Sequence, residues 1–272
     1  MNYLDYLRTD KFPHFWCSGC GNGIVLCAIA RAFEELDLTL ENTVVVTGIG
    51  CWGKADDYVR TNSFHGTHGR ALAFATGIKL ANPSLNVVVL MGDGDGITIG
   101  ANHFIHAARR NVDVTAILVN NFNYGMTGGQ YSGTTPEERI TTTSRYGHIE
   151  EGFDICAVAK AAGARYVARA STENPQQLKN LIRDGIKKQG FACIEAISPC
   201  PTHFGRNNGM RSPAALMRWV NENSVTPAQA VAMSEEELAG KLVMGLICDR
   251  PGEDYSTKYQ HVIEKAQSEV KK

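Results

Sequence analysis

Short runs of consecutive apolar residues, most of them β-branched, recur along this chain and limit its fold more than any other feature. Five runs of strand length are found, at Val44–Thr47, Val87–Met91, Thr115–Val119, Tyr166–Ala168 and Ala192–Ile197. Most are apolar on successive residues rather than on alternate ones, as is typical of strands buried on both faces. Segments with helical spacing separate them. The sequence therefore predicts an α/β fold in which a parallel sheet carries helices on both faces.

The helical segments begin and end with recognisable signals. By apolar spacing we predict helices over 21–36, 68–80, 99–110 and 175–189. The last is the clearest, because Asn174 is a good N-cap, Pro175 suits the first helical position and Gly190 ends the segment. Residues 120–150 are rich in Gly, Thr and Asn and are predicted to form a long functional loop.

The part of the chain from Arg211 onward shows helical patterns and no run that predicts a strand. Ser234 and Glu237 form a capping box before Leu238. We therefore predict two parts, an α/β domain over 1–210 and a helical C-terminal extension over 211–272 that serves packing or subunit contact.

The composition excludes several classes of function. The chain has 272 residues, 43% of them hydrophobic, and a net charge of −1, so no bulk charge favours nucleic acid or an anionic membrane. No stretch approaches the roughly 20 apolar residues of a membrane span. The N-terminal residues MNYLDYLRTDKF lack the apolar core of a signal peptide, so we expect a cytoplasmic protein.

Acidic and amide side chains follow two of the predicted strands. Asp93 lies in the turn GDGDG after the strand at 87–91, and Asn121 follows the strand at 115–120. The carboxyl ends of neighbouring parallel strands meet at one edge of a sheet, where ligands bind. Mg²⁺ takes six oxygens and usually keeps substrate phosphates among them, so Asp93, Asn121 and one backbone carbonyl fit a site for a magnesium diphosphate. A lone GDG also forms ordinary turns, but this placement favours a cofactor.

Eight cysteines are many for a cytoplasmic chain, and four of them lie in three separate loops. These are Cys17 and Cys20 in CSGCG, Cys51 after the first predicted strand and Cys200 after the last. Four thiolates suit a structural zinc or a [4Fe–4S] cluster, and their spacing alone does not separate the two. A redox Cys-x-x-Cys is a third reading, which leaves Cys51 and Cys200 without a role. The other cysteines, Cys27, Cys156, Cys193 and Cys248, are expected to be small buried residues.

Longer strings around these residues resemble a known family. GDG followed at this distance by Asn is similar to the fingerprint of thiamine diphosphate enzymes. NYGMTGGQ (123–130) and HGTHGRALAFATGIKLANP (65–83) resemble the β subunits of 2-oxoacid:ferredoxin oxidoreductases, and the resemblance covers roughly residues 14–210. It implies a thiamine diphosphate-binding fold in which Asp93, the Asn121 side chain and the Asn123 carbonyl bind Mg²⁺.

The resemblance also implies that the four cysteines hold a [4Fe–4S] cluster. Oxidative chemistry on thiamine diphosphate needs an electron acceptor nearby, and a low-potential cluster accepts electrons whereas zinc does not. The cofactor-binding residues predicted on this basis are Cys51, Gly92, Asp93, Gly94, Asp95, Asn121, Tyr124, Gly125, Met126 and Thr127.

Four further residues are expected to take part in catalysis or specificity. His65, His68 and Arg70 lie in the string at 65–83 and are predicted to line the cofactor pocket, the alternative for each being a helix cap or a surface side chain. Lys54, three residues after Cys51, is predicted to face the cofactor and to pair with a distal carboxylate of the substrate. Such a cation favours 2-oxoglutarate over pyruvate; the alternative is a solvated surface lysine.

The function implied is the CoA-dependent oxidative decarboxylation of a 2-oxoacid, reversible if ferredoxin is sufficiently reduced. The string GDGDG…GANHFIHAARRN (92–111) is most similar to the group that acts on 2-oxoglutarate and makes succinyl-CoA and CO₂, with electrons passing through the cluster to ferredoxin. The alternatives are pyruvate or a branched-chain 2-oxoacid as substrate, a non-redox thiamine diphosphate decarboxylase or synthase with a structural zinc, and a non-catalytic scaffold.

The chain carries only the diphosphate-binding half of such an active site. We therefore expect an α subunit to complete it, in an αβ or (αβ)₂ assembly, and we expect neither a nucleic acid nor a membrane as partner.

Overall fold

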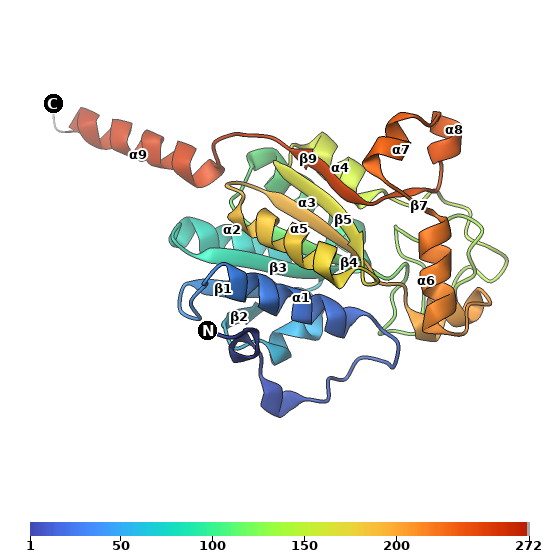
Figure 1. The fold of residues 1–272 in the computed structure, drawn as a ribbon. Helices are drawn as coiled ribbons and strands as arrows, with labels where there is room; N and C mark the ends of the chain where they lie inside the picture. The colour runs from blue at the N-terminus through green and yellow to red at the C-terminus, as the bar shows by residue number, and fades with distance from the viewer. Residues whose placement is uncertain (271–272) are drawn as a thin grey trace.

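The computed structural model describes residues 1–270, and its centre is a seven-stranded sheet (Figure 1). The strand order is β2-β1-β3-β4-β6-β5-β9; β1 to β6 run parallel, and β9 is antiparallel to β5. The strands are β1 (Thr43–Thr47), β2 (Asn62–His65), β3 (Asn86–Gly92), β4 (Thr115–Asn120), β5 (Tyr166–Ser171), β6 (Ala192–Ile197) and β9 (Gly245–Asp249). The predicted α/β fold with a parallel sheet is confirmed.

Helices cover both faces of the sheet (Figure 1). One face packs on α1 (Asn22–Glu35) and α5 (Pro175–Lys187), the other on α2 (Ala71–Ala81), α3 (Ala101–Arg110) and α4 (Ile155–Ala162). Along β3, Val88 belongs to the first core and Val89 to the second. Because successive side chains of a strand point to opposite faces, a strand between two helical layers is expected to be mostly apolar on both faces.

The four predicted helices all form, with ends that shift by up to three residues. Asn174 accepts a hydrogen bond from the Gln177 amide, and Pro175 is the first residue of α5, as predicted. Before Arg211, one strand and one α-helix were not predicted. β2 is an edge strand whose four residues are all exposed, so it has no apolar run, and α4 is short, with only three buried residues.

The prediction that the chain lacks strands after Arg211 is wrong. This part holds β7 (Ser224–Val225), β8 (Leu242–Val243) and β9, and β9 extends the main sheet. β9 gives no buried-strand signal because it is an edge strand that is only half-buried and ends in Asp249. The helices here are α6 (Pro213–Glu222), α7 (Pro227–Val231), α8 (Glu235–Leu238) and α9 (Tyr255–Val270), and α9 projects from the body (Figure 1). The capping box of Ser234 and Glu237 is present at α8.

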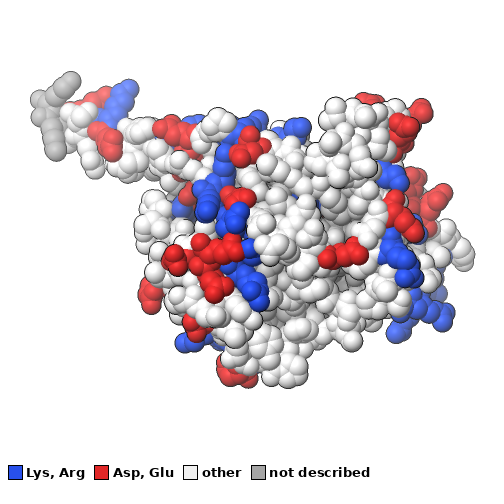
Figure 2. Space-filling model, in the orientation of Figure 1, with Lys and Arg blue, Asp and Glu red and all other residues white. Residues whose placement is uncertain are grey.

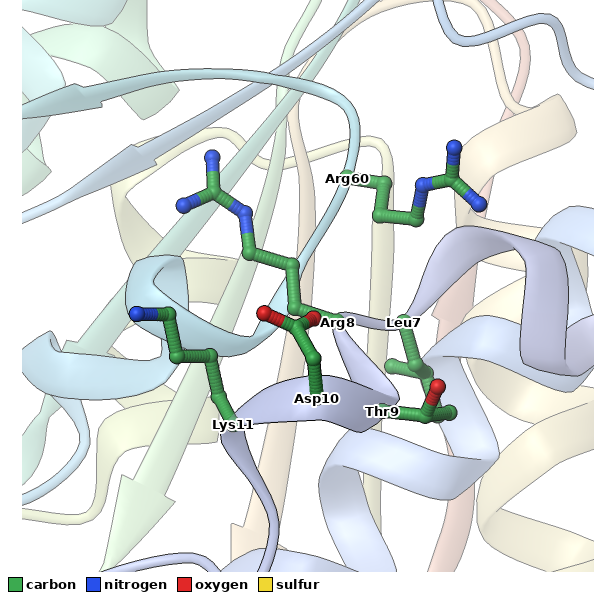
Figure 3. Close-up of a pocket in the computed structure, with 6 residues that line it drawn as sticks. All are labelled: Leu7, Arg8, Thr9, Asp10, Lys11 and Arg60. Carbon is green, nitrogen blue, oxygen red and sulfur yellow. The ribbon is translucent and has the colours of Figure 1, made fainter.

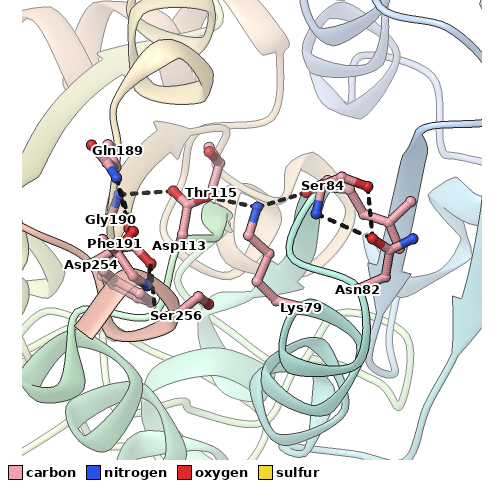
Figure 4. Close-up of polar contacts among 12 residues, drawn as sticks. Lys79, Asn82, Ser84, Asp113, Thr115, Gln189, Gly190, Phe191, Asp254 and Ser256 are labelled. Atoms are coloured by element: carbon pink, nitrogen blue, oxygen red, sulfur yellow. Dashed lines mark hydrogen bonds and ion pairs between the residues drawn. The ribbon is translucent and has the colours of Figure 1, made fainter. Parts of the chain in front are cut away.

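Charged and polar side chains close the amino ends of the strands (Figure 4). The ammonium of Lys79, on α2, lies 2.6 Å from Asp113 Oδ2 and donates to the Leu85 carbonyl at 2.7 Å. The other oxygen of Asp113 accepts from the Gly190 amide at 2.8 Å. Lys79, Asp113 and Gly190 come from three different connections, so these contacts join the segments that enter β3, β4 and β6.

The surface carries both signs of charge. On the face shown in Figure 2, Lys and Arg side chains are interspersed with Asp and Glu, and broad areas carry neither. Within residues 1–270, none of the helices combines the length and the apolar character that crossing a bilayer requires.

Candidate active site

The carboxyl ends of β1, β3 and β4 surround a pocket. It is lined by Ile49, Gly50, Cys51, Trp52, His68, Gly92, Asp93, Gly94, Asp95, Asn121, Asn123, Tyr124, Gly125, Met126 and Thr127. All ten residues predicted to bind the cofactor are in this set, together with His68 and Asn123. A larger depression elsewhere is lined by Leu7, Arg8, the 3-10 helix η2 (Thr9–Lys11) and Arg60, and all of these residues except Leu7 are exposed (Figure 3). This depression contains none of the predicted site residues, so the smaller pocket is the candidate active site.

Asp93, the first residue after β3, is held firmly in this pocket. Its side chain is buried, and Oδ2 accepts hydrogen bonds from Ser132 Oγ and Thr134 Oγ1, both at 2.6 Å. Burial raises the pKa of Asp93, while the two hydroxyls and the nearby amides of Asn121 and Gly94 act in the opposite direction. Both hydroxyls bind the same oxygen, Oδ2, so neither of them occupies the other carboxylate oxygen.

The two asparagines after β4 lie beside this carboxylate. Asn121 Oδ1 accepts from the Asn123 amide at 3.1 Å, and the Asn121 backbone lies against Asp93. The side chain of Asn123 is buried, yet neither its oxygen nor its nitrogen has a hydrogen-bond partner in the described structure. Because an unpaired buried amide is costly, this carboxamide indicates a polar ligand in the pocket.

Tyr124 connects the loop after β4 with the loop after β3. Its hydroxyl donates to the Gly94 carbonyl at 3.2 Å, and a Cβ on Gly94 would lie 2.3 Å from its ring. Only glycine fits at position 94. The backbone that enters the π-helix η4 (Gly94–Ile99) is thereby kept at the pocket wall.

Asp95 joins three loops rather than facing open space. It is buried, accepts from the Gly69 amide at 2.7 Å and the Ile49 amide at 3.3 Å, and lies 2.7 Å from His68 Nδ1. Burial raises the pKa of Asp95, and the two amides and the imidazole lower it. The contact with His68 has an ion-pair distance but not the geometry of a hydrogen bond, and the His68 imidazole lines the pocket.

The four cysteines of the sequence motif come together next to the same pocket. A Cβ on Gly125 would lie 3.5 Å from the Cys200 sulfur and 3.7 Å from the Cys51 sulfur. Burial, together with the neighbouring cysteines of the set, Cys17 and Cys200 among them, raises the pKa of Cys20 to about 12 and that of Cys51 to about 11. Thiols that raise each other's pKa in this way are suited to a metal centre, whose positive charge reverses the effect.

Hydrogen bonds fix the loops that carry these cysteines. The Trp16 indole donates to the Cys51 carbonyl at 2.6 Å, and the Gly21 amide donates to Ser198 Oγ at 3.1 Å. The second bond links the CSGCG loop to the loop that contains Cys200. The remaining cysteines lie away from the pocket: Cys156 and Cys193 are buried, and Cys27 and Cys248 are half-buried.

Three residues predicted to act in catalysis or specificity do not line the pocket. Lys54 lies on the 3-10 helix η3 (Gly53–Tyr58), where its ammonium is 2.6 Å from Asp57 Oδ2 and its side chain is 39% exposed. His65 Nδ1 lies 3.0 Å from both Asp56 and Thr47. Arg70 donates to the His68 carbonyl at 2.9 Å. His68 is thus the one of the four that the structure brings to the pocket.

Ser132 and Thr134 were not predicted, because no motif of the sequence singles them out. They follow Asp93 by about forty positions in a loop without regular structure, and their contact with it depends on how that loop folds. The abundance of Gly, Thr and Asn between 120 and 150 is the one signal that pointed to this segment.

Comparison with known proteins places the chain in a family. Residues 48–196 match the model of the thiamine pyrophosphate enzyme, C-terminal TPP binding domain. The chain is 49% identical over 268 residues to the 2-oxoglutarate synthase subunit KorB of Methanothermobacter marburgensis, covering 98% of this chain and 94% of that protein. It is 50% identical over 266 residues to the KorB subunit of Methanocaldococcus jannaschii, covering 98% of each chain.

A solved structure agrees with this placement. It is described as the 2-oxoglutarate:ferredoxin oxidoreductase from Magnetococcus marinus with 2-oxoglutarate, coenzyme A and succinyl-CoA bound. The match has a TM-score of 0.87 at 32% sequence identity and covers 98% of this chain and 91% of that chain. Together with the pocket at the carboxyl edge of the sheet, these matches show that the chain belongs to the family of 2-oxoacid:ferredoxin oxidoreductase β subunits, in the group of the 2-oxoglutarate synthase subunit KorB.

Proposed function

We propose that this β subunit binds thiamine diphosphate through Mg²⁺ held by the Asp93 carboxylate, the Asn121 side chain and the Asn123 carbonyl. The observation that carries the proposal is the set of oxygens at the ends of β3 and β4, with the unpaired carboxamide of Asn123 beside it. Hard oxygen ligands from a carboxylate and amides suit Mg²⁺, which completes its shell with diphosphate oxygens and water. When bound, thiamine diphosphate supplies the carbanion chemistry that cleaves the bond to the carboxyl group of a 2-oxoacid.

Cys17, Cys20, Cys51 and Cys200 are the proposed ligands of a [4Fe–4S] cluster. In a tetrahedral zinc site with Zn–S bonds of 2.3 Å, the sulfurs lie about 3.8 Å apart. Among the described residues, only Asp154, Cys156 and Glu195 form a group of three His, Cys or carboxylate ligand atoms that all lie within 4.8 Å of one another. No three of the four cysteine sulfurs are therefore that close together. The wider spacing favours a cluster over zinc.

The proposed reaction converts 2-oxoglutarate and CoA to succinyl-CoA and CO₂, and releases two electrons and a proton. The electrons pass one at a time through the cluster to two oxidised ferredoxins. The relatives named 2-oxoglutarate synthase and the neighbour with 2-oxoglutarate, coenzyme A and succinyl-CoA bound support this substrate. The sulfurs of Cys51 and Cys200 flank Gly125 of the pocket wall, so the path for the electrons is short.

In this proposal the chain's own residues bind and orient. Asp93 and Asn121 fix the diphosphate end, Gly94 and Gly125 let the backbone approach the cofactor, and His68, which lies beside Asp95, presents an imidazole to the pocket. Roles for Lys54, His65 and Arg70 stay predictions, as does the cytoplasmic location. The name KorB and the single α/β sheet support an α subunit as the partner that completes the site.

The test uses the chain purified anaerobically with its α partner. We expect brown protein with iron and sulfide near four atoms each per αβ pair. We also expect reduction of ferredoxin that requires 2-oxoglutarate, CoA, thiamine diphosphate and Mg²⁺ together. Colourless, zinc-containing protein would contradict the cluster, and turnover of pyruvate at the rate of 2-oxoglutarate would contradict the substrate.

A further inference from the structure

The hydroxyl of Thr134 lies between Asp93 and a buried polar network in the centre of the sheet. Thr134 Oγ1 donates to Asp93 Oδ2 at 2.6 Å and is 3.1 Å from Asn120 Oδ1. We propose that Thr134 is a positioning residue, which orients the Asp93 carboxylate so that its other oxygen is presented to the divalent cation. This inference rests on the proposed function of Asp93.

The amide of Asn120 has one possible orientation. Its Nδ2 donates to Glu195 Oε1 at 2.8 Å, and its Oδ1 accepts from the Phe122 amide at 3.1 Å. A carboxylate can only accept and a backbone N–H can only donate, so exchanging the oxygen and the nitrogen would break both bonds. Asn120 Oδ1 is therefore a fixed acceptor beside Thr134.

An ion pair holds this network in place. Glu195 Oε2 accepts from Arg169 Nε at 2.7 Å, and both side chains are almost fully buried between β5 and β6. Arg169 also donates to Asp154, the N-cap of α4, at 2.5 Å. A buried ion pair contributes little net stability compared with apolar side chains, so its presence in the core favours a role in specifying geometry.

The hydroxyl proton of Thr134 therefore has three possible acceptors, Asp93 Oδ2 at 2.6 Å, Asn120 Oδ1 at 3.1 Å and Ser132 Oγ at 3.1 Å. The carboxylate takes it, because that contact is shorter and is assisted by charge. Ser132 Oγ donates to the same carboxylate oxygen at 2.6 Å. Two donors on Oδ2 prevent the carboxylate from turning, and Oδ1 is kept for the cation. Partners that orient a metal ligand commonly change metal affinity 10–100-fold when they are removed.

Thr135 provides a matched control on the same loop. It is as buried as Thr134, and its hydroxyl donates to the Phe122 carbonyl at 2.8 Å and accepts from the Ser132 amide at 2.9 Å, but it does not bind Asp93. Replacing either threonine by valine removes one hydroxyl and keeps the shape. An effect that comes only from loop folding would therefore appear in both variants.

The experiment measures Mn²⁺ binding to the αβ complex in the presence of thiamine diphosphate. Mn²⁺ prefers the same oxygen ligands as Mg²⁺, and free Mn²⁺ is counted by its electron paramagnetic resonance signal. We expect Thr134→Val to raise the Kd of Mn²⁺ about 10–100-fold. Thr134→Ser, which keeps the hydroxyl, and Thr135→Val are expected to bind as the wild type does. Ser132→Ala should weaken binding in the same direction as Thr134→Val.

Equal losses in Thr134→Val and Thr135→Val would overturn the inference, because they would reduce Thr134 to a loop contact. Wild-type affinity in Thr134→Val would overturn it as well. If Thr134→Val fails to assemble, Ser132→Ala and the rescue by Thr134→Ser still decide the question. A wild-type complex that shows no saturable Mn²⁺ site would instead refute the proposed function of Asp93, so the two failures are distinguishable.

Discussion

The two ends of the central parallel strands use similar side chains in opposite ways. At the amino ends, the Lys79 ammonium has both a carboxylate and a carbonyl partner, and Asp113 uses both of its oxygens. At the carboxyl ends, the buried Asn123 carboxamide has no partner in the described structure, and Asp93 has both hydroxyl donors on one oxygen. Polar groups that satisfy each other stabilise the fold, whereas buried groups without partners indicate a ligand.

The largest effect expected from this comparison is at Asp93. Asp93→Ala removes the one buried carboxylate proposed to bind Mg²⁺, and we expect the αβ complex to lose thiamine diphosphate on gel filtration while its circular dichroism stays that of the wild type. Calorimetry measures the cofactor affinity. An unchanged affinity in this variant would show that the difference between the two edges has no functional meaning.

The second prediction concerns the cysteines at the same edge. Cys200→Ser should abolish or strongly reduce cluster content, because an alcohol is a poor ligand for iron compared with a thiolate. Cys27→Ser is the control, since Cys27 lies on α1 away from the pocket. Iron and sulfide analysis distinguishes the two variants. Full occupancy in Cys200→Ser, or loss in Cys27→Ser, would refute the ligand set.

Lys79 tests the opposite edge. Lys79→Met removes the ammonium from a mostly buried ion pair and leaves the partly solvent-exposed Asp113 carboxylate without it. We expect the free energy of unfolding to fall by about 1–3 kcal/mol, below the usual cost of breaking a fully buried pair because Asp113 is partly exposed. Urea denaturation measures the loss. Cofactor affinity of the folded variant should stay at the wild-type value, and a parallel loss of affinity would remove the distinction between the edges.

The smallest effect is expected at Asn174. This residue lies at the carboxyl edge, but its side chain already has a hydrogen-bond partner, so it tests whether location at that edge is enough to affect cofactor binding. Asn174 follows β5 at the carboxyl edge, but its side chain already caps α5 by accepting from the Gln177 amide. Asn174→Ala should cost about 1 kcal/mol of stability, as the loss of an N-cap does, and Asn174→Ser should restore most of it. Cofactor binding is expected to be unaffected. A change in thiamine diphosphate affinity would mean that the whole carboxyl edge acts as one unit.

Much of the fold was predictable because its local signals agree with one another. The strands at 44–47, 87–91 and 115–119 are apolar except for a terminal threonine in the first and the third, and the helix over 175–187 has its N-cap and its first-turn proline. β2 and β9 were missed because edge strands need no continuous apolar run. The division into 1–210 and 211–272 stays a prediction, although β9 joins the second part to the sheet of the first.

The predicted site residues divide in the same way. Asp93, Asn121 and Cys51 follow strands directly, and neighbouring parallel strands bring their carboxyl ends together whatever else the chain does. Lys54, His65 and Arg70 were selected by resemblance and by distance along the chain. The structure gives their side chains other partners, because a short helix or turn after a strand can point a side chain in any direction.

The sequence by itself determined the α/β class, the edge of the sheet that carries the chemistry and the residue types placed there, since periodicity and motif spacing are local properties. Only the tertiary structure decided which hydroxyls hold Asp93, which amide lacks a partner and how far apart the sulfurs lie. These features join residues far apart in the chain, such as Asp93 and Thr134 or Asn120 and Glu195. Their contacts depend on loop closure and core packing, for which no short stretch of sequence holds the information.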